Sequence, residues 1–510
     1  MKSHRNSSFQ CMLIRRRNSV NRLINPHDRV CEYSLFFVFS NKSNTQQLRI
    51  KLVENILHNM FKTSRHCTLL SLRQFNNQSV IFRDAHHSCK ILVVGGGTAG
   101  CTMAAKFSNK FKGSKDRVVI VEPSERHYYQ PMFTLIGGGV RSLESSYKSM
   151  EKVLPKDAQW IKDRVTKFEP ESNTVTVASG DSIRYEYLIV ALGLQLYWNK
   201  IPGLSEALED PKVPVCSIYG PETVGNVFKT IENTKSGSAY FTFPNSPVKC
   251  PGAPQKIAYL AEDYWHKKRK LQDIQVTYNT ALPVIFGVKK YADALWKVCQ
   301  SKNISVNLQT NLIEIRSSKN EAVFQNLQNP EELNTVKYSM LHVTPPMGPP
   351  ELLKNHPALT NEAGFLSVDP QTLRHDKYSN IYGLGDCTNT PNSKTMAAIA
   401  AQSKVVYENL SADLGGNVSK ETYNGYASCP LVTGYGKCIL AEFDYKLQPT
   451  ETFPINQGKE YFAMYLLKKD FFPYLYWNWM LKGHWNGPAI FRKYLNFFSR
   501  KEVAPTSKTQ

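Results

Sequence analysis

The sequence predicts an α/β fold with two Rossmann-like domains, and three stretches support this prediction. Residues 91–100 (ILVVGGGTAG) combine a buried apolar strand with a G-x-G-x-x-G turn. Residues 118–121 (VVIV) form a second apolar strand, which ends at Glu122. Residues 381–387 (IYGLGDC) form another apolar strand, which ends in a Gly-Asp pair. Apolar strands separated by helical patterns are typical of a parallel sheet covered by helices.

The glycine turn has the spacing of a dinucleotide-binding loop. Its first glycine permits the tight turn, the second lets a pyrophosphate approach the backbone, and the third lets the helix pack closely on the strand. The helix predicted over residues 101–110 would offer the phosphates free N–H groups and a partial positive charge. Glu122, 22 residues after the last glycine, lies where a carboxylate holds ribose hydroxyls. The predicted loop comprises Gly95, Gly97, Thr98, Ala99 and Gly100.

Later features of the chain narrow the cofactor to FAD. Residues 185–193 (YEYLIVALG) are predicted to form a buried strand that closes a flavin-binding sheet, with Gly193 against the cofactor. Asp386, at a strand end, can aim its carboxylate at a ribityl hydroxyl. The helix predicted from Lys394 can point N–H groups at the electron-rich edge of a flavin. Gln130, after the second strand, lies in a loop that suits a fold over the bound cofactor.

A second α/β unit is predicted over residues 201–330, but it lacks the glycine fingerprint. The strand predicted over residues 238–243 is followed by PNSPVKCPGAPQK, where a nicotinamide cofactor would need its pyrophosphate glycines. We interpret this absence as evidence against NAD(P)H as the reductant. The predicted division is a leader (1–88), a flavin domain in two parts (89–200 and 335–425), a second Rossmann-like domain (201–334) and a C-terminal region (426–510).

The positive charge of the chain is concentrated at its start. The 510 residues carry a formal net charge of +21, and residues 1–90 hold 15 Lys/Arg against 4 Asp/Glu. This distribution argues against a nucleic-acid partner. Residues 1–88 are rich in Arg, Ser and Asn, which predicts a mitochondrial transit segment with little fixed structure. Two alternatives remain open: a disordered basic tail that carries no targeting signal, and a translation start at Met60.

The C-terminal region predicts a membrane-surface segment. Its longest uncharged run, residues 471–481, has 11 residues, short of the ~20 needed to span a bilayer. Seven aromatic residues lie within residues 471–485, with Lys and Arg around them. Trp, Tyr and Lys favour the membrane interface, so we expect helices that lie in the bilayer surface. A dimer interface or a pair of core helices is the alternative.

The cysteines offer candidates for redox chemistry, with a small buried apolar role as the alternative, and their spacing does not support a zinc or iron–sulfur site. Eleven cysteines occur without a C-x-x-C motif or a Cys/His cluster. Cys250 lies on the turn after a strand of the second unit, and Cys429 precedes the C-terminal segment. If folding brings them together, they could form a disulfide that a nucleophile opens. The proline after each one favours an extended backbone at the cysteine. Cys387, next to Asp386, is the main rival.

Several stretches closely resemble sequence motifs of the mitochondrial sulfide:quinone oxidoreductases. They are VEPSERHYYQP, FTFPNSPVKCPGAPQK, FGVKKYADAL, LHVTPPM, GDCTN with the following P-SKT, SCPLVTGY, and LAEFDY with ETFP. The resemblance covers residues 90–495. It departs at Pro251, where alanine is expected after the first cysteine.

The resemblance implies a flavoprotein with a redox cysteine pair on the matrix face of the inner mitochondrial membrane. Hydrogen sulfide would open a Cys250–Cys429 disulfide and leave a persulfide on Cys429, whose sulfur passes to glutathione or sulfite. Two electrons would pass through FAD to ubiquinone. Lys256 and Lys468 match lysines near the quinone and acceptor openings. The implied FAD contacts are residues 95–100, Glu122, Gln130, Val165, Asp386 and the helix start from Lys394 to Met396.

Two other functions remain open. A type II NADH:quinone oxidoreductase would share the fold, the FAD and the surface tail, and the missing second fingerprint argues against it. A flavin-binding interaction protein that has lost catalysis would keep the glycine loop and lack a working cysteine pair.

Overall fold

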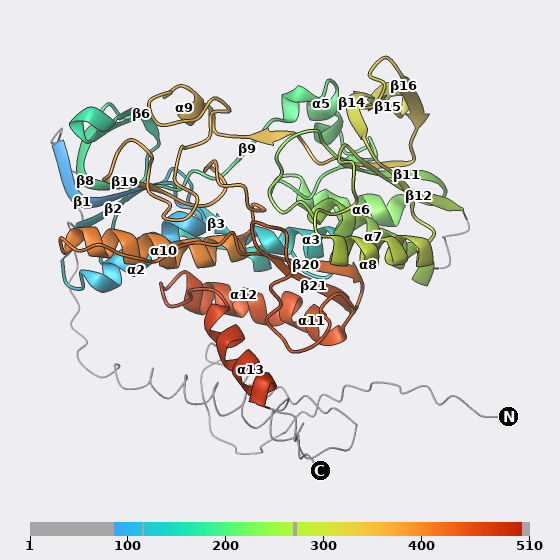
Figure 1. Ribbon diagram of the computed structural model, residues 1–510. Coiled ribbons are helices and arrows are strands. Elements are labelled where there is room, and N and C mark those ends of the chain that lie inside the picture. The colour runs from blue at the N-terminus through green and yellow to red at the C-terminus, as the bar shows by residue number, and fades with distance from the viewer. Residues whose placement is uncertain (1–85, 115–116, 269–272, 502–510) are drawn as a thin grey trace, which may run out of the picture. The chain divides into compact units, whose positions relative to one another are not determined.

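The computed structural model describes residues 86–114, 117–268 and 273–501 (Figure 1). The predicted transit segment, apart from its last three residues, and the alternative start at Met60 lie outside these ranges.

The first sheet of the described residues has seven strands, and the glycine loop follows its strand β1. Six strands follow the order β5-β2-β1-β8-β7-β6, and the seventh, β19, pairs with β8. Strand β8 is long enough to pair with β1 along one edge and with both β7 and β19 along the other. The last of these strands comes from a much later part of the chain. The strands are β1 (His86–Val94), β2 (Val118–Val121), β5 (Gln159–Ile161), β6 (Val165–Glu169), β7 (Thr174–Val177), β8 (Ser182–Val190) and β19 (Ile381–Gly383).

The central strands are apolar because they are buried on both faces of the sheet. All four residues of β2 are buried, as are Ile91 to Val94 of β1, which is the pattern of a parallel strand in the middle of a sheet. The register pairs Val94 with both Val121 and Val190, and Val190 with Gly383. The carboxyl ends of β2, β1, β8 and β19 therefore lie side by side.

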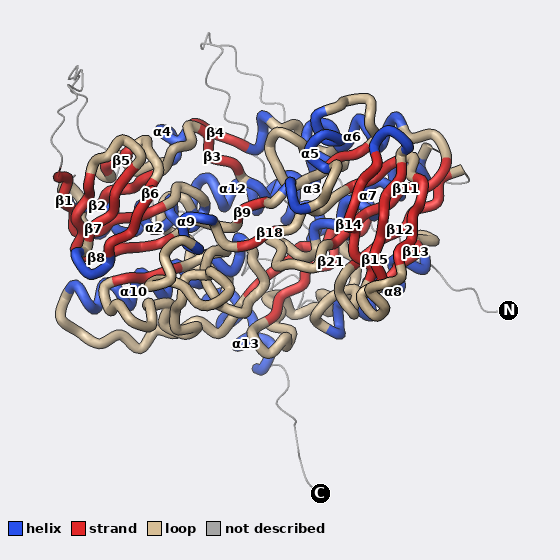
Figure 2. The backbone as a smooth tube through the Cα atoms, turned by 90° about the horizontal axis from the view of Figure 1, so that it is seen from above, coloured by secondary structure: helices blue, strands red, loops and turns tan. Residues whose placement is uncertain are grey.

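A second, five-stranded parallel sheet has the order β10-β17-β11-β12-β13. Figure 2 shows its strands beside a separate three-stranded antiparallel sheet, β14-β15-β16. The bounds are β10 (Val215–Cys216), β11 (Gly237–Phe243), β12 (Ile274–Thr280), β13 (Ser305–Asn307) and β17 (Met340–His342), then β14 (Thr310–Arg316), β15 (Glu321–Asn326) and β16 (Leu333–Lys337). The strand predicted at 238–243 is confirmed as β11.

Two long helices lie together below the first sheet (Figure 1). They are α2 (Thr98–Lys110), which begins in the glycine loop, and α10 (Met396–Leu414), which begins two residues after the predicted start at Lys394. The second sheet carries α6 (Val224–Asn233), α7 (Ala253–Lys267) and α8 (Lys289–Ser301). The short elements are α3 (Phe133–Gly137), α4 (Met150–Val153), α5 (Leu204–Glu209), α9 (Glu351–Lys354), β3 (Arg126–Tyr128), β4 (Tyr147–Ser149), β9 (Gln195–Leu196) and β18 (Met347–Gly348).

The C-terminal region is a hairpin followed by an irregular helical segment. The hairpin is β20 (Ala427–Gly434) with β21 (Lys437–Phe443). The segment continues as α11 (Phe462–Leu466), the π-helical turn η8 (Leu467–Phe471), α12 (Phe472–Leu475), the π-helical turn η9 (Tyr476–Met480) and α13 (Ala489–Lys501).

The aromatic residues of this segment divide between the protein interior and its surface. Tyr476 and Trp477 are buried in the main core. Large apolar side chains at the surface are Phe462, Phe471, Tyr474, Ile490 and Tyr494. Among the described helices, none combines the length and the apolar character needed to cross a bilayer. This two-sided arrangement leaves the prediction of a membrane-surface segment open.

Candidate functional site

The predicted phosphate-binding loop lies at the carboxyl edge of the first sheet. Gly95 has φ +100°, and a Cβ there would lie 2.6 Å from the Ala191 carbonyl oxygen. A Cβ at Gly100 would lie 1.7 Å from the Gly95 carbonyl oxygen, so helix and strand pack as the fingerprint requires. A Cβ at Gly97 would meet nothing within 4 Å. The loop is therefore closed on the protein side and open at the position where a pyrophosphate would approach.

The N-terminus of α2 is free to bind an anion. No side chain caps it, because the residue before Thr98 is Gly97. Its first N–H groups are thus available to phosphate oxygens. Ala99, in the first turn, is buried, and a Cβ at Gly385, two residues after β19, would lie 3.4 Å from the Ala99 Cβ. The loop residues fit the dinucleotide that the sequence predicts.

Glu122 follows β2 and fixes the loop from the side. Its carboxylate accepts hydrogen bonds from the backbone N–H of Gly96 at 2.5 Å and of Ser124 at 2.7 Å. Each carboxylate oxygen can accept more than one hydrogen bond, so the side chain can order the loop and still accept from ribose hydroxyls.

Two of the remaining predicted cofactor residues, Gly193 and Asp386, lie just beyond the same carboxyl edge of the sheet. Val190 and Gly383 are paired at the ends of β8 and β19. Gly193 comes three residues after Val190, with φ +70° and open space around it, and Asp386 comes three residues after Gly383. Burial raises the pKa of the Asp386 carboxyl, against the charges of Lys394 and Lys249. Lys394 donates through Nζ to the carbonyls of Thr388 and Thr390, both at 2.8 Å. Met396 is the first residue of α10, Val165 begins β6, and Gln130 is exposed at the end of the loop after β3.

The structure brings the two predicted cysteines together as free thiols. The Sγ atoms of Cys250 and Cys429 lie 3.9 Å apart although 179 residues separate them. Cys250 lies just before α7, and Cys429 lies in β20 of the C-terminal hairpin. The backbone N–H of Cys250 donates to the carbonyl oxygen of Lys394 at 2.7 Å. This bond holds the cysteine pair beside the residues that lead into α10.

The two thiols differ strongly in acidity. The hydrogen bond from Cys429 holds the pKa of Cys250 well below its usual range, against the effect of burial, and the charges of Lys256 and Lys468 lower it further. The same hydrogen bond, together with burial, raises the pKa of Cys429. Cys250 is thus the thiolate of the pair and Cys429 its proton donor.

Two buried lysines surround this pair. The Nζ of Lys256, in α7, lies 3.4 Å from Cys250 Sγ. Burial alone would lower the pKa of Lys256, but the two sulfurs, Cys250 foremost, hold it above its ordinary value. Lys468, in η8, donates to the carbonyl oxygen of Pro131 at 2.6 Å, and burial lowers its pKa to about 8. Both lysines therefore lie inside the protein near the thiols.

The expectation of an extended backbone is wrong at one cysteine. Cys429 is extended within β20, but Cys250 has φ +52°, in the left-handed region. A tight turn in which Ala253 N–H donates to the Cys250 carbonyl oxygen at 2.8 Å holds this conformation. Such a conformation costs about 1 kcal/mol for a non-glycine residue and is common at functional sites.

Two groups of site residues carry no strong signal in the sequence. A Cβ at Gly252 would lie 2.7 Å from Cys429 Sγ and 2.6 Å from Leu431 Cδ2, so this glycine makes room for the pair. The CPG triplet hints at such a close approach. Tyr476 of the C-terminal segment hydrogen-bonds Thr98 of the glycine loop, across 378 residues. No local pattern announces that contact.

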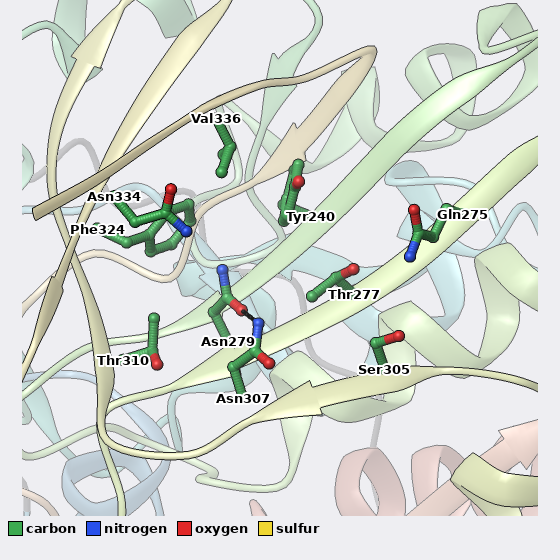
Figure 3. A pocket seen from close by; sticks show the side chains of 10 residues that line it. All are labelled: Tyr240, Gln275, Thr277, Asn279, Ser305, Asn307, Thr310, Phe324, Asn334 and Val336. Carbon is green, nitrogen blue, oxygen red and sulfur yellow. Dashed lines mark hydrogen bonds between the residues drawn. The ribbon is translucent and has the colours of Figure 1, made fainter.

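A separate cavity of the described residues lies apart from this site. A cavity of about 260 Å³ beneath the antiparallel sheet is lined mainly by uncharged polar side chains, including the hydrogen-bonded Asn279 and Asn307 (Figure 3). It contains none of the predicted site residues. Within the described ranges, no group of three or more His, Cys, Asp or Glu is arranged to hold a metal ion.

Comparisons with known proteins agree with the predicted fold class. A pyridine nucleotide-disulphide oxidoreductase family model matches residues 89–233. A structure of the sulfide:quinone oxidoreductase from the hyperthermophilic bacterium Aquifex aeolicus superposes with a TM-score of 0.68 at 20% identity, covering 84% of this chain and all of that one. The α/β fold of this oxidoreductase class is confirmed.

Two curated relatives are similar over most of their length. The mitochondrial sulfide:quinone oxidoreductase of Mus musculus is 50% identical over 409 residues, which cover 80% of this chain and 90% of the mouse protein. The corresponding protein of Dictyostelium discoideum is 45% identical over 400 residues, covering 78% and 87%. On this similarity, the chain is an oxidoreductase that belongs to the mitochondrial sulfide:quinone oxidoreductase family.

Proposed function

We propose that this protein is an FAD-dependent enzyme that oxidises hydrogen sulfide and reduces ubiquinone. The observation that supports this most is the pair of thiols at 3.9 Å, one acidic and one not, between α7 and β20. The sulfur of sulfide would become a persulfide on Cys429 and then pass to glutathione or sulfite. With sulfite as the acceptor, thiosulfate should form in equimolar amount with reduced quinone, and chromatography of the products tests this.

The sulfur chemistry follows from the difference in acidity. Hydrosulfide attacks Cys429 Sγ in the disulfide form of the pair, the S–S bond breaks, and its electron pair leaves on Cys250 Sγ. Because the thiol with the lower pKa leaves faster, Cys250 is the better leaving group. Sulfite or a glutathione thiolate then removes the outer sulfur from Cys429. When the Cys429 thiol and the Cys250 thiolate bond again, they release two electrons and the proton of Cys429.

FAD would be held by the loop at residues 95–100 together with Glu122, Gly193 and Asp386. Further contacts would come from Gln130, Val165, Lys394 and Met396. When bound there, FAD would accept the two electrons from the cysteine pair and deliver them to quinone. The protein's own contribution is to hold Cys250 next to Lys394 and to keep it a thiolate through Lys256. We propose this electrostatic role for Lys256 and Lys468, near the openings for quinone and the sulfur acceptor.

The second Rossmann-like unit argues against the NADH:quinone alternative. In such a unit, a dinucleotide pyrophosphate binds at the N-terminus of the helix after the first strand, here α7 after β11. Cys429 and Leu431 of β20 pack against Gly252 at that helix start. The space for a pyrophosphate is thus taken by the thiol pair. The same pair argues against a non-catalytic flavin-binding protein.

Gly97→Ala should weaken FAD binding without disturbing the fold. The new methyl group meets no protein atom within 4 Å, yet it occupies the space where the pyrophosphate approaches. We expect FAD affinity to fall by at least about tenfold, measured by FAD fluorescence during dissociation. Gly225→Ala, in α6, also adds a methyl group in open space and should leave FAD affinity unchanged. Unchanged affinity of the Gly97 variant would contradict the assigned loop.

We also propose that the C-terminal segment attaches the enzyme to the matrix face of the inner mitochondrial membrane. Phe471 and Ile490 are 40% and 57% exposed, and Lys469, Lys482 and Lys493 lie near them in the sequence. Exposed aromatic and apolar side chains with neighbouring cations suit an interfacial segment.

Replacing the exposed apolar side chains should release the protein from vesicles. Each inserted side chain contributes on the order of 2 kcal/mol, so Phe471→Ser and Ile490→Ser should each reduce partitioning by about tenfold or more. Sedimentation with vesicles of mixed zwitterionic and anionic phospholipid measures this. Val284→Ser, at a 46% exposed position in the second domain, is the matched control. Equal sedimentation of all variants would refute the attachment surface.

A further inference from the structure

The C-terminal segment reaches the dinucleotide loop through one buried tyrosine. Tyr476, the first residue of η9, is 1% exposed. Its hydroxyl lies 2.8 Å from Thr98 Oγ1 and 2.5 Å from His127 Nε2. The Nδ1 of His127 lies 2.9 Å from the carbonyl oxygen of Gly96. The tyrosine is therefore linked to both sides of Gly97, the residue that faces the open space of the loop.

The chemistry of these groups fixes the direction of each hydrogen bond. A carbonyl oxygen only accepts, so His127 Nδ1 carries the proton and its Nε2 is the acceptor. Tyr476 therefore donates to His127 Nε2, and Thr98 donates to the Tyr476 oxygen. Burial lowers the pKa of His127 to about 4, which keeps the ring neutral near pH 7, as this chain of bonds requires. Cys101 Sγ donates to the same Gly96 carbonyl oxygen at 3.1 Å and lies 3.5 Å from His127 Nδ1, so the thiol belongs to this buried network as well.

The segment is also attached to the far end of the same helix. Asn109 Nδ2, in the last turn of α2, donates to the carbonyl oxygen of Lys482 at 2.9 Å. The buried Lys106 Nζ donates to the carbonyl oxygen of Gly483 at 3.4 Å and to the side chain of Asn486. Residues 476–486 therefore contact α2 from its first residue to its last turn, and α2 begins at the phosphate-binding loop.

We propose that Tyr476 is a positioning residue for the dinucleotide loop, so that retention of FAD depends on docking of the C-terminal segment on α2. The proposal rests on the assignment of FAD to this loop. Without the tyrosine hydroxyl, Thr98 and His127 each lose a buried partner, and the backbone around Gly97 is no longer held in the shape that receives a pyrophosphate. Because coupling between two sites is reciprocal, FAD should in turn stabilise the docked segment.

The test compares two variants that each remove one hydroxyl from neighbouring turns. Tyr476→Phe removes the bonded hydroxyl, whereas Tyr474→Phe removes one from a side chain that is 52% exposed. FAD release is followed by fluorescence after dilution of the holoenzyme, with far-UV circular dichroism as the measure of folding. We expect FAD to bind about five- to tenfold more weakly in Tyr476→Phe and unchanged in Tyr474→Phe. Equal FAD affinity in Tyr476→Phe and wild type overturns the proposal.

A second variant and a second measurement keep the outcome clear. Asn109→Ala removes the remote contact with Lys482 and touches no loop residue, and it should also accelerate FAD release. Trypsin should cut the C-terminal segment at Lys482 faster in FAD-free protein than in holoenzyme. A loss of helical signal in Tyr476→Phe with unchanged FAD release would indicate a purely structural role and overturn the proposal. If the wild-type protein itself binds no FAD, the assignment of the cofactor fails instead.

Discussion

Cys250→Ser and Cys429→Ser should each abolish sulfide-dependent quinone reduction while FAD stays bound. Each variant leaves one sulfur of the 3.9 Å pair, and a hydroxyl can neither form the disulfide nor leave as a stable anion. We expect turnover to fall at least about a thousandfold, because removing a nucleophile or leaving group typically costs that much. The measurement is the rate of quinone reduction with saturating sulfide. The visible flavin spectrum reports whether the cofactor is retained.

Cys387→Ser is the discriminating control for this pair. Cys387 lies beside Asp386 and is the rival in the sequence, but its buried sulfur donates to the backbone carbonyl oxygens of Val190 at 3.7 Å and Leu384 at 3.8 Å rather than to a second thiol. A serine can donate to the same oxygens, so near-normal turnover is expected. Normal turnover in Cys250→Ser together with loss in Cys387→Ser would reverse the assignment.

Lys256→Met should slow the enzyme and move its pH profile upward. The lysine charge stabilises the Cys250 thiolate from 3.4 Å, so its removal raises the pKa of Cys250 and reduces the thiolate fraction near pH 7. The hydrogen bond from Cys429 remains, so the loss is partial, and the thiolate fraction falls about tenfold for each unit by which the pKa of Cys250 comes to exceed the pH. We expect about a tenfold loss at pH 7 that recovers as the pH rises, measured as kcat against pH.

The matched control lies on the same helix. Lys267→Met removes an equal charge near the end of α7, where the lysine is half-exposed and paired with Asp263. Its pH profile should match that of the wild type. An unshifted profile for Lys256→Met would show that this lysine does not stabilise the thiolate.

Features set by local sequence were predictable. The glycine spacing, the apolar run of β2 and Glu122 depend on residues close together in the chain, and the structure has them as expected. Helix α10 begins two residues after the predicted start at Lys394, because the Thr395 side chain accepts a hydrogen bond from the backbone N–H of Ala398 and caps the helix there. Lys394 instead uses its carbonyl to hold Cys250.

Features set by distant contacts were not predictable. Proline at 251 suggested an extended Cys250, but a tight turn and the contact with Lys394 impose a left-handed conformation. The aromatic C-terminal segment predicts a membrane surface, with a dimer interface or a pair of core helices as the alternative, but its sequence does not reveal that two of its members, Tyr476 and Trp477, pack around His127. Nothing in the spacing of residues 349 positions apart reveals that contact. The effect of Pro251 beside the thiolate has no structural account.

Anaerobic titration of the purified protein with sulfide tests the central claim most directly. If the cysteine pair accepts electrons from sulfide and passes them to a flavin, sulfide should bleach the yellow flavin absorbance with a stoichiometric endpoint, and adding a quinone should restore it. NADH should leave the spectrum unchanged. A flavin that NADH bleaches and sulfide does not would contradict the account and favour an NADH:quinone oxidoreductase.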